Sequence, residues 1–211
     1  MIPLILRMKK VMHKEIARAQ DLVVEETYKV FDKAVLHGGT AIWRCYKGNR
    51  FSEDIDVYLP RDLKRINLLF ENLEKKGFII EKKKVGENSL FSKLRLGSTI
   101  VRLEAIFKKQ KGSLKEYETI EGNLITVYTL LPKELIKEKV STYSKRIKIR
   151  DLYDIFFLLR YIKNNKEVSA YLKTLIMKFI KPSDEKELKV LITEGIVPDV
   201  ESMIAYIKKF I

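Results

Sequence analysis

The sequence predicts an α/β (α+β) lobe with a mixed sheet over residues 1–131, followed by an all-helical lobe over residues 132–211. Two observations support this fold class. In the first part of the chain, segments that alternate polar and apolar residues, as strands do, are interspersed with segments of helical spacing. From Pro132 onward only helical patterns occur. A cleft is expected between two such lobes.

The first lobe is expected to begin with a helix over residues 14–33, where apolar side chains recur at helical spacing. A brief strand then runs into a turn at Gly38-Gly39. A short helix follows, with Thr40 near its N-terminus and Gly48 just past its end.

The rest of the first lobe is predicted to contain strands and one helix. The stretch "DIDVYL", residues 54–59, alternates acidic with apolar residues and predicts a strand, and residues 62–76 predict a helix that Gly77 closes. Residues 108–117 are expected to form a basic loop, before a hairpin around Gly122-Asn123 within 115–129. Three further strands, separated by turn residues, are expected at 78–85, 89–96 and 99–107.

The second lobe is expected to contain only helices. Pro182 and the segment 195–198 mark breaks in the helical pattern. The expected helices are 132–147, 150–163, 167–180, 184–194 and 198–211.

Composition points to an anionic partner. The chain has 42 Lys and Arg against 28 Asp and Glu, a net charge of +14. A solvated surface rich in Lys and Glu accounts for many of the lysines. It does not account for the surplus, which favours RNA, DNA or nucleotide phosphates as partners. The basic segments 82–84, 108–111 and 145–150 suit an RNA backbone or are plain solvated surface.

The same composition predicts a soluble protein of the cytoplasm with no membrane partner. Cys45 is the only cysteine, so neither an intrachain disulfide nor a cysteine-based metal site is expected. The apolar start of the chain is interrupted by Arg7, Lys9 and Lys10 and is too short for a signal peptide or a membrane span.

Asp54 and Asp56 are the first candidate functional residues. Residues i and i+2 of a strand point to the same face, so the two carboxylates crowd together. Such like charges raise each other's pKa unless a cation lies between them. Mg²⁺, with Mn²⁺ as the alternative, is the expected cation, because it combines a few carboxylates with substrate phosphates. Metal ions in such sites align an attacking oxygen and a leaving group at phosphorus.

Gly38, Gly39 and Thr40 are the second candidate group. Glycine allows a close approach of the backbone to a ligand, and the following helix N-terminus offers free N–H groups to a phosphate. A Gly-Gly pair is often only a turn, and an Asp-x-Asp pair often lies on a surface strand by chance. Their combination in one strand–turn–helix–strand unit is more specific and predicts a shared metal–phosphate site.

The stretch "GGTAIWRCYKGNRFSEDIDVYL" resembles the signature of the nucleotidyltransferase (polymerase-β-like) superfamily, and more narrowly its AbiEii/AbiGii-type toxin branch. A later stretch, "EKVSTYSKRIKIRDLYDIFFLL" at 138–159, is similar to a second region of that branch. The resemblance implies a polymerase-β-like lobe and a Mg²⁺-dependent transfer of a nucleotidyl group from an NTP. It also implies a toxin with a cognate antitoxin partner.

The resemblance implies a third acid on a neighbouring strand, and Glu104 is the candidate. Alternation places Arg102, Glu104 and Ile106 on one face of the strand. A carboxylate flanked by apolar residues is costly unless something binds it. Glu104 would then ligate metal or accept a proton from the attacking hydroxyl. The alternative is an Arg102–Glu104 pair that faces solvent on an edge strand.

Three more residues are carried over by the resemblance. Lys139 would bind the β- and γ-phosphates as a flexible point charge, and its alternative is one more surface lysine. Asp151 would orient Lys139 or an attacking hydroxyl, and its alternative is a helix N-cap. Asp154 is expected to pair with a base such as Arg150. Arg50 would brace the acids or contact phosphate.

The acceptor and the activity itself leave alternatives open. Positive charge and the resemblance together favour an RNA acceptor, with the 3′ end of tRNA as the candidate. One alternative is transfer to a protein or a small molecule. Another is a regulator that binds nucleotide or RNA without catalysis. His37, beside the glycine pair, is expected to be structural or a minor ligand contact.

Overall fold

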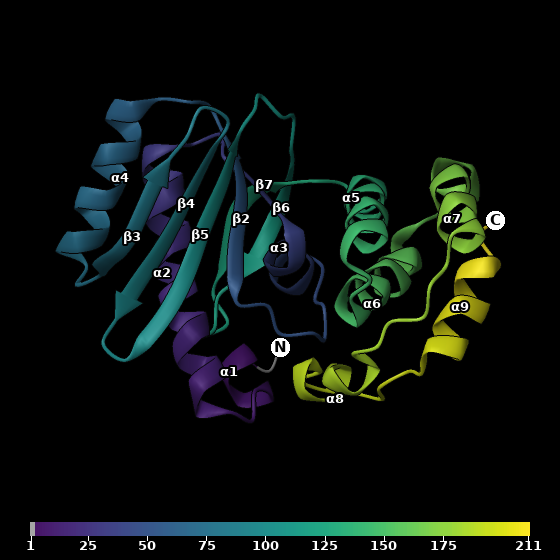
Figure 1. The fold of residues 1–211 in the computed structure, drawn as a ribbon. Helices are drawn as coiled ribbons and strands as arrows, with labels where there is room; N and C mark the ends of the chain where they lie inside the picture. The colour runs from purple at the N-terminus through teal and green to yellow at the C-terminus, as the bar shows by residue number, and fades with distance from the viewer. Residues whose placement is uncertain (1–2) are drawn as a thin grey trace. The chain divides into compact units, whose positions relative to one another are not determined.

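The computed structural model describes residues 3–211, which form two compact units (Figure 1). Unit 1 holds the described residues up to Lys47 together with Phe51–Leu130. Unit 2 holds Gly48–Arg50 and Leu131–Ile211. A three-residue segment that interrupts unit 1 in the sequence thus belongs with the C-terminal helices rather than with the sheet.

Unit 1 is built on one mixed sheet of seven strands in the order β3-β4-β5-β2-β1-β7-β6. β2 pairs with β5, and β1 with β7, in parallel, whereas all other neighbouring strands are antiparallel. The mixed sheet predicted from the sequence is confirmed. The strands are β1 Val35–His37, β2 Asp54–Leu59, β3 Ile79–Val85, β4 Ser89–Leu96, β5 Thr99–Phe107, β6 Ser113–Glu118 and β7 Leu124–Thr129.

Helices α2 (Val11–Val30) and α4 (Leu63–Lys75) pack on one face of the sheet. The alternating residues of β4 and β5 that point to these helices are buried and, except for Ser92, apolar, and together with the helices they form the main core. The opposite face of the same strands has polar side chains. A short helix α1 (Leu4–Arg7), which sequence periodicity did not predict, precedes α2.

Local signals explain where the elements of unit 1 begin and end. The side chain of Asp62 accepts a hydrogen bond from the backbone N–H of Arg65 and caps α4, and Gly77 follows its end with a φ of +91°. Strand β6 already starts at Ser113, so the basic loop expected over 108–117 is shorter than predicted. The predicted hairpin is confirmed as β6 and β7.

Unit 2 contains α5 Pro132–Arg146, α6 Ile149–Leu158, α7 Ser169–Met177, α8 Leu188–Leu191 and α9 Val200–Lys208. Several of these helices are shorter than the sequence predicts. The expected helix 150–163 ends as a 3₁₀ turn at Leu159–Tyr161, and the expected helix 184–194 is reduced to the turn Glu185–Glu187 and α8. Beyond α8, Ile192 forms an antiparallel bridge with Arg50. No helix within residues 3–211 is long and apolar enough to cross a membrane.

Candidate active site

The glycine turn and the aspartate pair lie in direct contact. Gly38 begins helix α3 (Gly38–Cys45) with a φ of +69°, a left-handed conformation that favours glycine. A methyl group at Gly38 would overlap with the carboxylate of Asp56. This contact arises because His37, the residue before Gly38, is the register partner of Asp56 across β1 and β2. The N-terminus of α3 is therefore held against an acidic side chain of β2.

Thr40 fixes α3 to the same strand. Its hydroxyl donates a 2.5 Å hydrogen bond to the backbone carbonyl of Asp54, and its side chain is fully buried. The hydroxyl thus holds the helix on β2, and a contribution of Thr40 to phosphate binding would come from its backbone N–H. His37 stacks on Tyr58 with ring centroids 4.0 Å apart, which fits the structural role expected for it.

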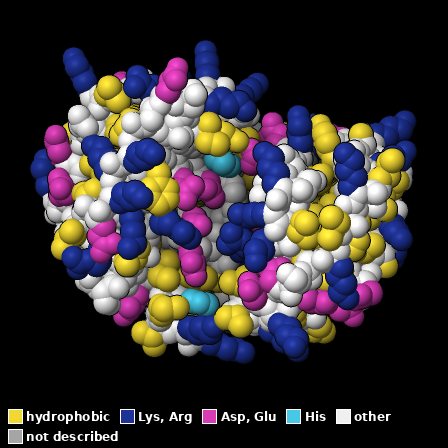
Figure 2. Space-filling view, viewed as in Figure 1, with side chains coloured by type: hydrophobic (Ala, Val, Ile, Leu, Met, Phe, Trp, Pro, Cys, Tyr) yellow, Lys and Arg dark blue, Asp and Glu magenta, His cyan; other side chains and the backbone are white. Residues whose placement is uncertain are grey.

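Asp54, Asp56 and Glu104 form what we call the acid row. On the parallel strands β2 and β5, Asp54 is in register with Arg102 and Asp56 with Glu104. Arg102 Nε donates to Asp54 Oδ1 at 2.5 Å. Figure 2 shows acidic side chains gathered among Lys and Arg side chains on the surface of the molecule.

Repulsion within the acid row affects the pKa of Glu104. Partial burial raises the pKa of Glu104, and the negative charges of Asp56 and Asp54 raise it further, whereas Arg102 acts in the opposite direction. The alternative of an Arg102–Glu104 pair on an edge strand is wrong, because β5 lies between β4 and β2 and Arg102 forms its ion pair with Asp54. The sequence placed Arg102 on this face but missed its pairing with Asp54.

The donor atoms of the acid row suit a divalent metal ion. These donors are carboxylate oxygens, which hard cations such as Mg²⁺ prefer, and the lack of a side chain at Gly38 leaves room for the Asp56 carboxylate. Within residues 3–211, no group of three or more His, Cys, Asp or Glu side chains is already arranged to hold a metal. The two aspartates therefore fit a metal whose other ligands are phosphate oxygens and water.

Unit 2 contains a second group of functional candidates, the unit 2 charge cluster, made of Arg50, Lys139, Arg146, Asp151 and Asp154. Lys139 Nζ lies 2.7 Å from Asp154 Oδ2 and 3.3 Å from Asp151 Oδ1. Arg50 donates to both oxygens of Asp154, and Arg146 to both oxygens of Asp151. Both aspartates are almost completely buried. The expected contact between Asp151 and Lys139 is present.

Two expectations for these residues are corrected. Asp154 does not pair with Arg150; its partners are Arg50 and Lys139. Asp151 is the third residue of α6 rather than its N-cap, which is Lys148. The guanidinium of Arg50 binds Asp154, and its expected contact with phosphate stays a prediction.

Both carboxylates of the charge cluster are compensated by its three cations. Burial alone would raise the pKa of Asp154, but the positive charges of Arg50 and Lys139, and their hydrogen bonds, outweigh it and hold this pKa below its usual value. Asp154 is consequently ionised and Lys139 has two carboxylate partners. Lys139 is also nearly buried, so the alternative of an ordinary surface lysine is wrong.

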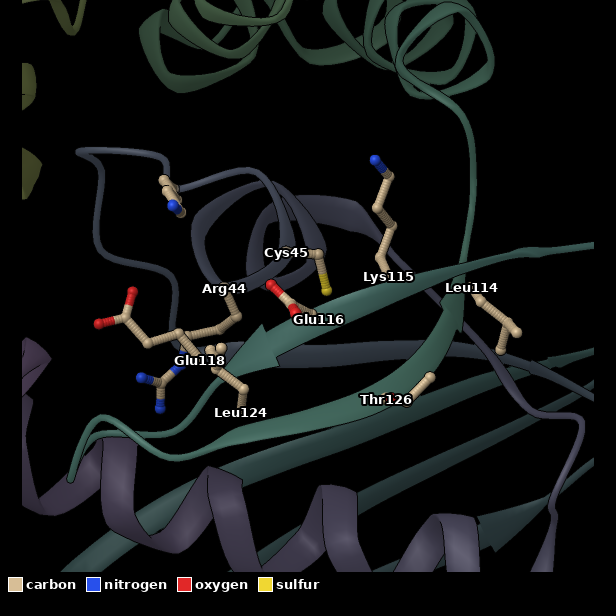
Figure 3. Close-up of a pocket in the computed structure, with 9 residues that line it drawn as sticks. Arg44, Cys45, Leu114, Lys115, Glu116, Glu118, Leu124 and Thr126 are labelled. Carbon is tan, nitrogen blue, oxygen red and sulfur yellow. The ribbon is translucent and has the colours of Figure 1, made fainter. Parts of the chain in front are cut away.

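A separate hollow of about 380 Å³ lies at the other end of the sheet, beside β6 and β7 (Figure 3). None of the sequence-predicted site residues lines it. Burial raises the pKa of the Cys45 thiol to about 12, so this cysteine lacks the thiolate that a nucleophile needs. The residues that line this hollow are Arg44, Cys45, Lys47, Leu114, Lys115, Glu116, Glu118, Leu124 and Thr126.

The mixed sheet, with an acidic pair on β2 next to a glycine turn at the start of α3, defines a polymerase-β-like nucleotidyltransferase fold. The nucleotidyltransferase toxin MenT4 from Mycobacterium tuberculosis H37Rv has a similar structure, with a TM-score of 0.66 at 18% identity over 94% of this chain and 82% of that chain. JHP933 from Helicobacter pylori matches with a TM-score of 0.63 at 16% identity, over 95% of this chain and 90% of that one. At such identities these likenesses show the fold alone.

The family itself is shown by the sequence. The family described as nucleotidyl transferase AbiEii toxin, Type IV TA system, matches residues 22–199, and the chain belongs to this family of toxin nucleotidyltransferases. No curated protein sequence matches the chain.

Proposed function

We propose that this protein transfers a nucleoside monophosphate from a Mg²⁺-bound NTP to an RNA acceptor, with the 3′ end of tRNA as the candidate, and releases pyrophosphate. The observation that supports this most strongly is the contact between Gly38 and Asp56. It would bring the proposed phosphate-binding turn and the proposed metal-binding carboxylate together, as a reaction at the phosphates of a nucleotide requires.

Asp54 and Asp56 are the proposed metal ligands, and Gly38 and Gly39 present the N-terminus of α3 to the triphosphate. When bound, Mg²⁺ would neutralise phosphate oxygens and stabilise the pyrophosphate leaving group. Asp54 exchanges its partner in this proposal, because its carboxylate is bound to Arg102 in the structure. Arg102 thus holds the carboxylate in place until a metal binds. Mn²⁺ is the expected substitute for Mg²⁺.

Glu104 is the proposed proton acceptor and third acid. The acceptor oxygen forms a bond to the α-phosphorus, the bond from that phosphorus to the bridging oxygen breaks, and the hydroxyl proton passes to a carboxylate. The raised pKa of Glu104, which follows from its burial and its acidic neighbours, makes it a better base than an ordinary surface glutamate.

The predicted roles in nucleotide binding are retained for Lys139, Asp151 and Arg50. Lys139 would neutralise the triphosphate, and Asp151 would orient it through the contact described above. Arg50 would act through Asp154, since two of its nitrogen atoms are engaged there.

An RNA acceptor is favoured by the charge of +14, which is large for a chain whose only anionic ligand is a nucleotide. The toxin family also supports a cognate antitoxin protein as a partner. Expression of the protein is therefore expected to arrest growth, and co-expression of a neighbouring gene product to relieve the arrest.

The transferase activity can be tested by incubating the purified protein with total RNA, Mg²⁺ and each of four α-labelled NTPs. We expect label on RNA from the wild type and none from Asp56→Asn. Asp32→Asn is the matched control, because Asp32 is highly exposed and lies outside the acid row, and it should label RNA as the wild type does.

Other outcomes separate the alternatives. Label on a protein or small molecule with none on RNA would replace the acceptor but keep the reaction. Binding of Mg²⁺–NTP with no turnover would identify a nucleotide-binding regulator. Absence of both binding and labelling with all four NTPs would overturn the proposal.

A further inference from the structure

A straight row of side chains begins at two members of the acid row and continues across the sheet to β3. Asp56 on β2 is the register partner of Glu104 on β5, and Glu104 is the partner of Phe91 on β4. Phe91 is in turn the partner of Lys84 on β3. Directly paired residues project from the same face of a sheet, so the four side chains lie side by side. With strands about 4.8 Å apart, Phe91 is two strand spacings, about 10 Å, from Asp56.

The far end of this row is a hollow of about 370 Å³, the Phe91 pocket, lined by Lys82, Lys84, Gly86, Ser89 and Phe91. Lys82 Nζ lies 5.3 Å from the centroid of the Phe91 ring, which places a cation and an aromatic surface in one small site. Phe91 is partly exposed, although alternate residues of β4 such as Leu90 are buried against the helices. The ring is therefore not needed to fill the core.

The charges of the Phe91 pocket are available to a ligand. On the same strands, Lys93 and Arg95 are neutralised by Glu81. Lys82 and Lys84 are exposed and have no acidic partner among residues 3–211. Two uncompensated lysines around an aromatic ring match a single-stranded nucleic acid, in which phosphates alternate with bases that stack.

The order of the strands indicates on which sides of the site the triphosphate and the acceptor would lie. Gly38, which would face the triphosphate, follows β1, whereas Glu104, which would face the acceptor hydroxyl, lies on β5. β2, with Asp54 and Asp56, separates the two. An acceptor that approaches from the side of Glu104 continues over β4 and β3, where the Phe91 pocket lies.

We propose that the Phe91 pocket binds a nucleotide of the RNA acceptor close to its reacting end, with the base stacked on Phe91 and the backbone phosphates against Lys82 and Lys84. This deepens the function proposed above and rests on it for the identity of the acceptor. The occupant is single-stranded, because the base must leave any duplex stack to reach the ring.

The test measures the affinity of the full-length protein for a short 5′-fluorescein single-stranded RNA of mixed sequence, by fluorescence anisotropy. We expect Phe91→Leu to weaken binding about tenfold, the lower part of the range for loss of one stacked base, and Phe91→Trp to retain it. Lys84→Gln should weaken binding and lower the slope of log affinity against log salt by about 0.7, the value for one phosphate contact of a single strand.

Lys64→Gln is the matched control for charge. Lys64 is an exposed lysine of the same unit, but it lies on α4, which packs on the opposite face of the sheet. It should leave both the affinity and the salt slope as in the wild type. Binding of Mg²⁺–NTP, measured by calorimetry, should be equal in all four variants, which shows that the nucleotide site is intact.

The outcomes distinguish this inference from the transferase proposal. If the wild type transfers nucleotides to RNA while Phe91→Leu and Lys84→Gln bind and use RNA normally, the pocket is not the acceptor site and the transferase proposal stands. If the variants lose RNA affinity although no NTP is ever turned over, the pocket binds RNA and the transferase proposal fails. A wild type without measurable RNA affinity would overturn the inference and favour a protein or small-molecule acceptor.

Discussion

Arg50 donates to both carboxylate oxygens of Asp154, at 2.8 and 2.9 Å, although 104 positions separate the two residues in the chain. Both side chains are buried. The planar guanidinium fits a carboxylate through two parallel hydrogen bonds, which a lysine cannot reproduce. This pair attaches the segment Gly48–Arg50 to the helices of unit 2.

Loss of Arg50 is expected to destabilise the protein strongly. In Arg50→Met, the buried carboxylate of Asp154 keeps only Lys139 as a partner, and breaking a buried pair from one side costs about 3–5 kcal/mol. The double variant Arg50→Met/Asp154→Leu should recover part of this loss. Urea denaturation provides the measurement. Arg18→Met, which removes an exposed pair with Glu121, should cost about 1 kcal/mol or less. Equal losses for the two arginines would contradict the prediction.

Gly38→Ala is expected to be more harmful than the same change at Gly97. Both glycines have positive φ angles, +69° and +59°, so alanine adds backbone strain of about 1–2 kcal/mol at each. At Gly97 the methyl group meets nothing within 4 Å, whereas at Gly38 it displaces the Asp56 carboxylate. Thermal unfolding and NTP labelling should show a modest loss of stability for Gly97→Ala with normal activity, and loss of activity for Gly38→Ala. Normal labelling by Gly38→Ala would show that the contact with Asp56 is dispensable.

Glu104→Gln should stabilise the metal-free protein. Because the pKa of Glu104 is raised above 4.5, its contribution to stability is present below that pH and is lost as the pH rises through the folded-state pKa. At neutral pH the charged group opposes folding, and glutamine removes the repulsion. We expect a higher melting temperature than the wild type in EDTA and a smaller increase upon addition of Mg²⁺. Glu71→Gln, an exposed change on α4, is the control. A lower melting temperature for Glu104→Gln in EDTA would show that the acid is held by favourable contacts.

His13 is expected to make the protein sensitive to mild acid. Its imidazole stacks on Phe51, with centroids 3.9 Å apart, and burial, followed by the charge of Lys10, lowers its pKa below 6.5. The unfolded chain therefore binds more protons than the folded protein just below pH 6.5, so stability falls as the pH decreases through this window. Urea denaturation across this range should show a steeper loss for the wild type than for His13→Phe. Parallel curves for the two proteins would mean that His13 titrates equally in both states.

The strands of unit 1 were predictable because their ends are marked locally. The three strands β3, β4 and β5 are bounded by turns at Gly77, Gly86–Asn88 and Gly97-Ser98, so their predicted limits agree with the structure to within a residue. The region around α8 has a helical pattern bounded by Pro182 and residues 195–198, but no local signal marks the end of the helix at Leu191. There Thr193 donates its backbone N–H to the carbonyl of Asn49, and this distant contact draws the chain into an extended bridge instead of a longer helix.

The acid row was predictable in part for the same reason. Strand alternation alone places Asp54 and Asp56 together, and the same rule orients Arg102 and Glu104. The pairing of strands determines which of these residues meet, and a single sequence does not encode the order β5-β2-β1 in any local signal. The partner of Arg50 was missed because the sequence contains many acids and the true one, Asp154, lies 104 positions further along the chain.

Because the segment Gly48–Arg50 belongs to unit 2, the two units are not simply consecutive in the sequence. The chain crosses from one unit to the other after Lys47, after Arg50 and after Leu130. If the chain were divided after Leu130, the first fragment would contain Arg50 without Asp154, its buried partner. The second fragment would lack the residue that forms the bridge with Ile192. We therefore expect that separation of the two units requires redesign of residues 48–50, which lie between Gly38 and Asp56 in the sequence.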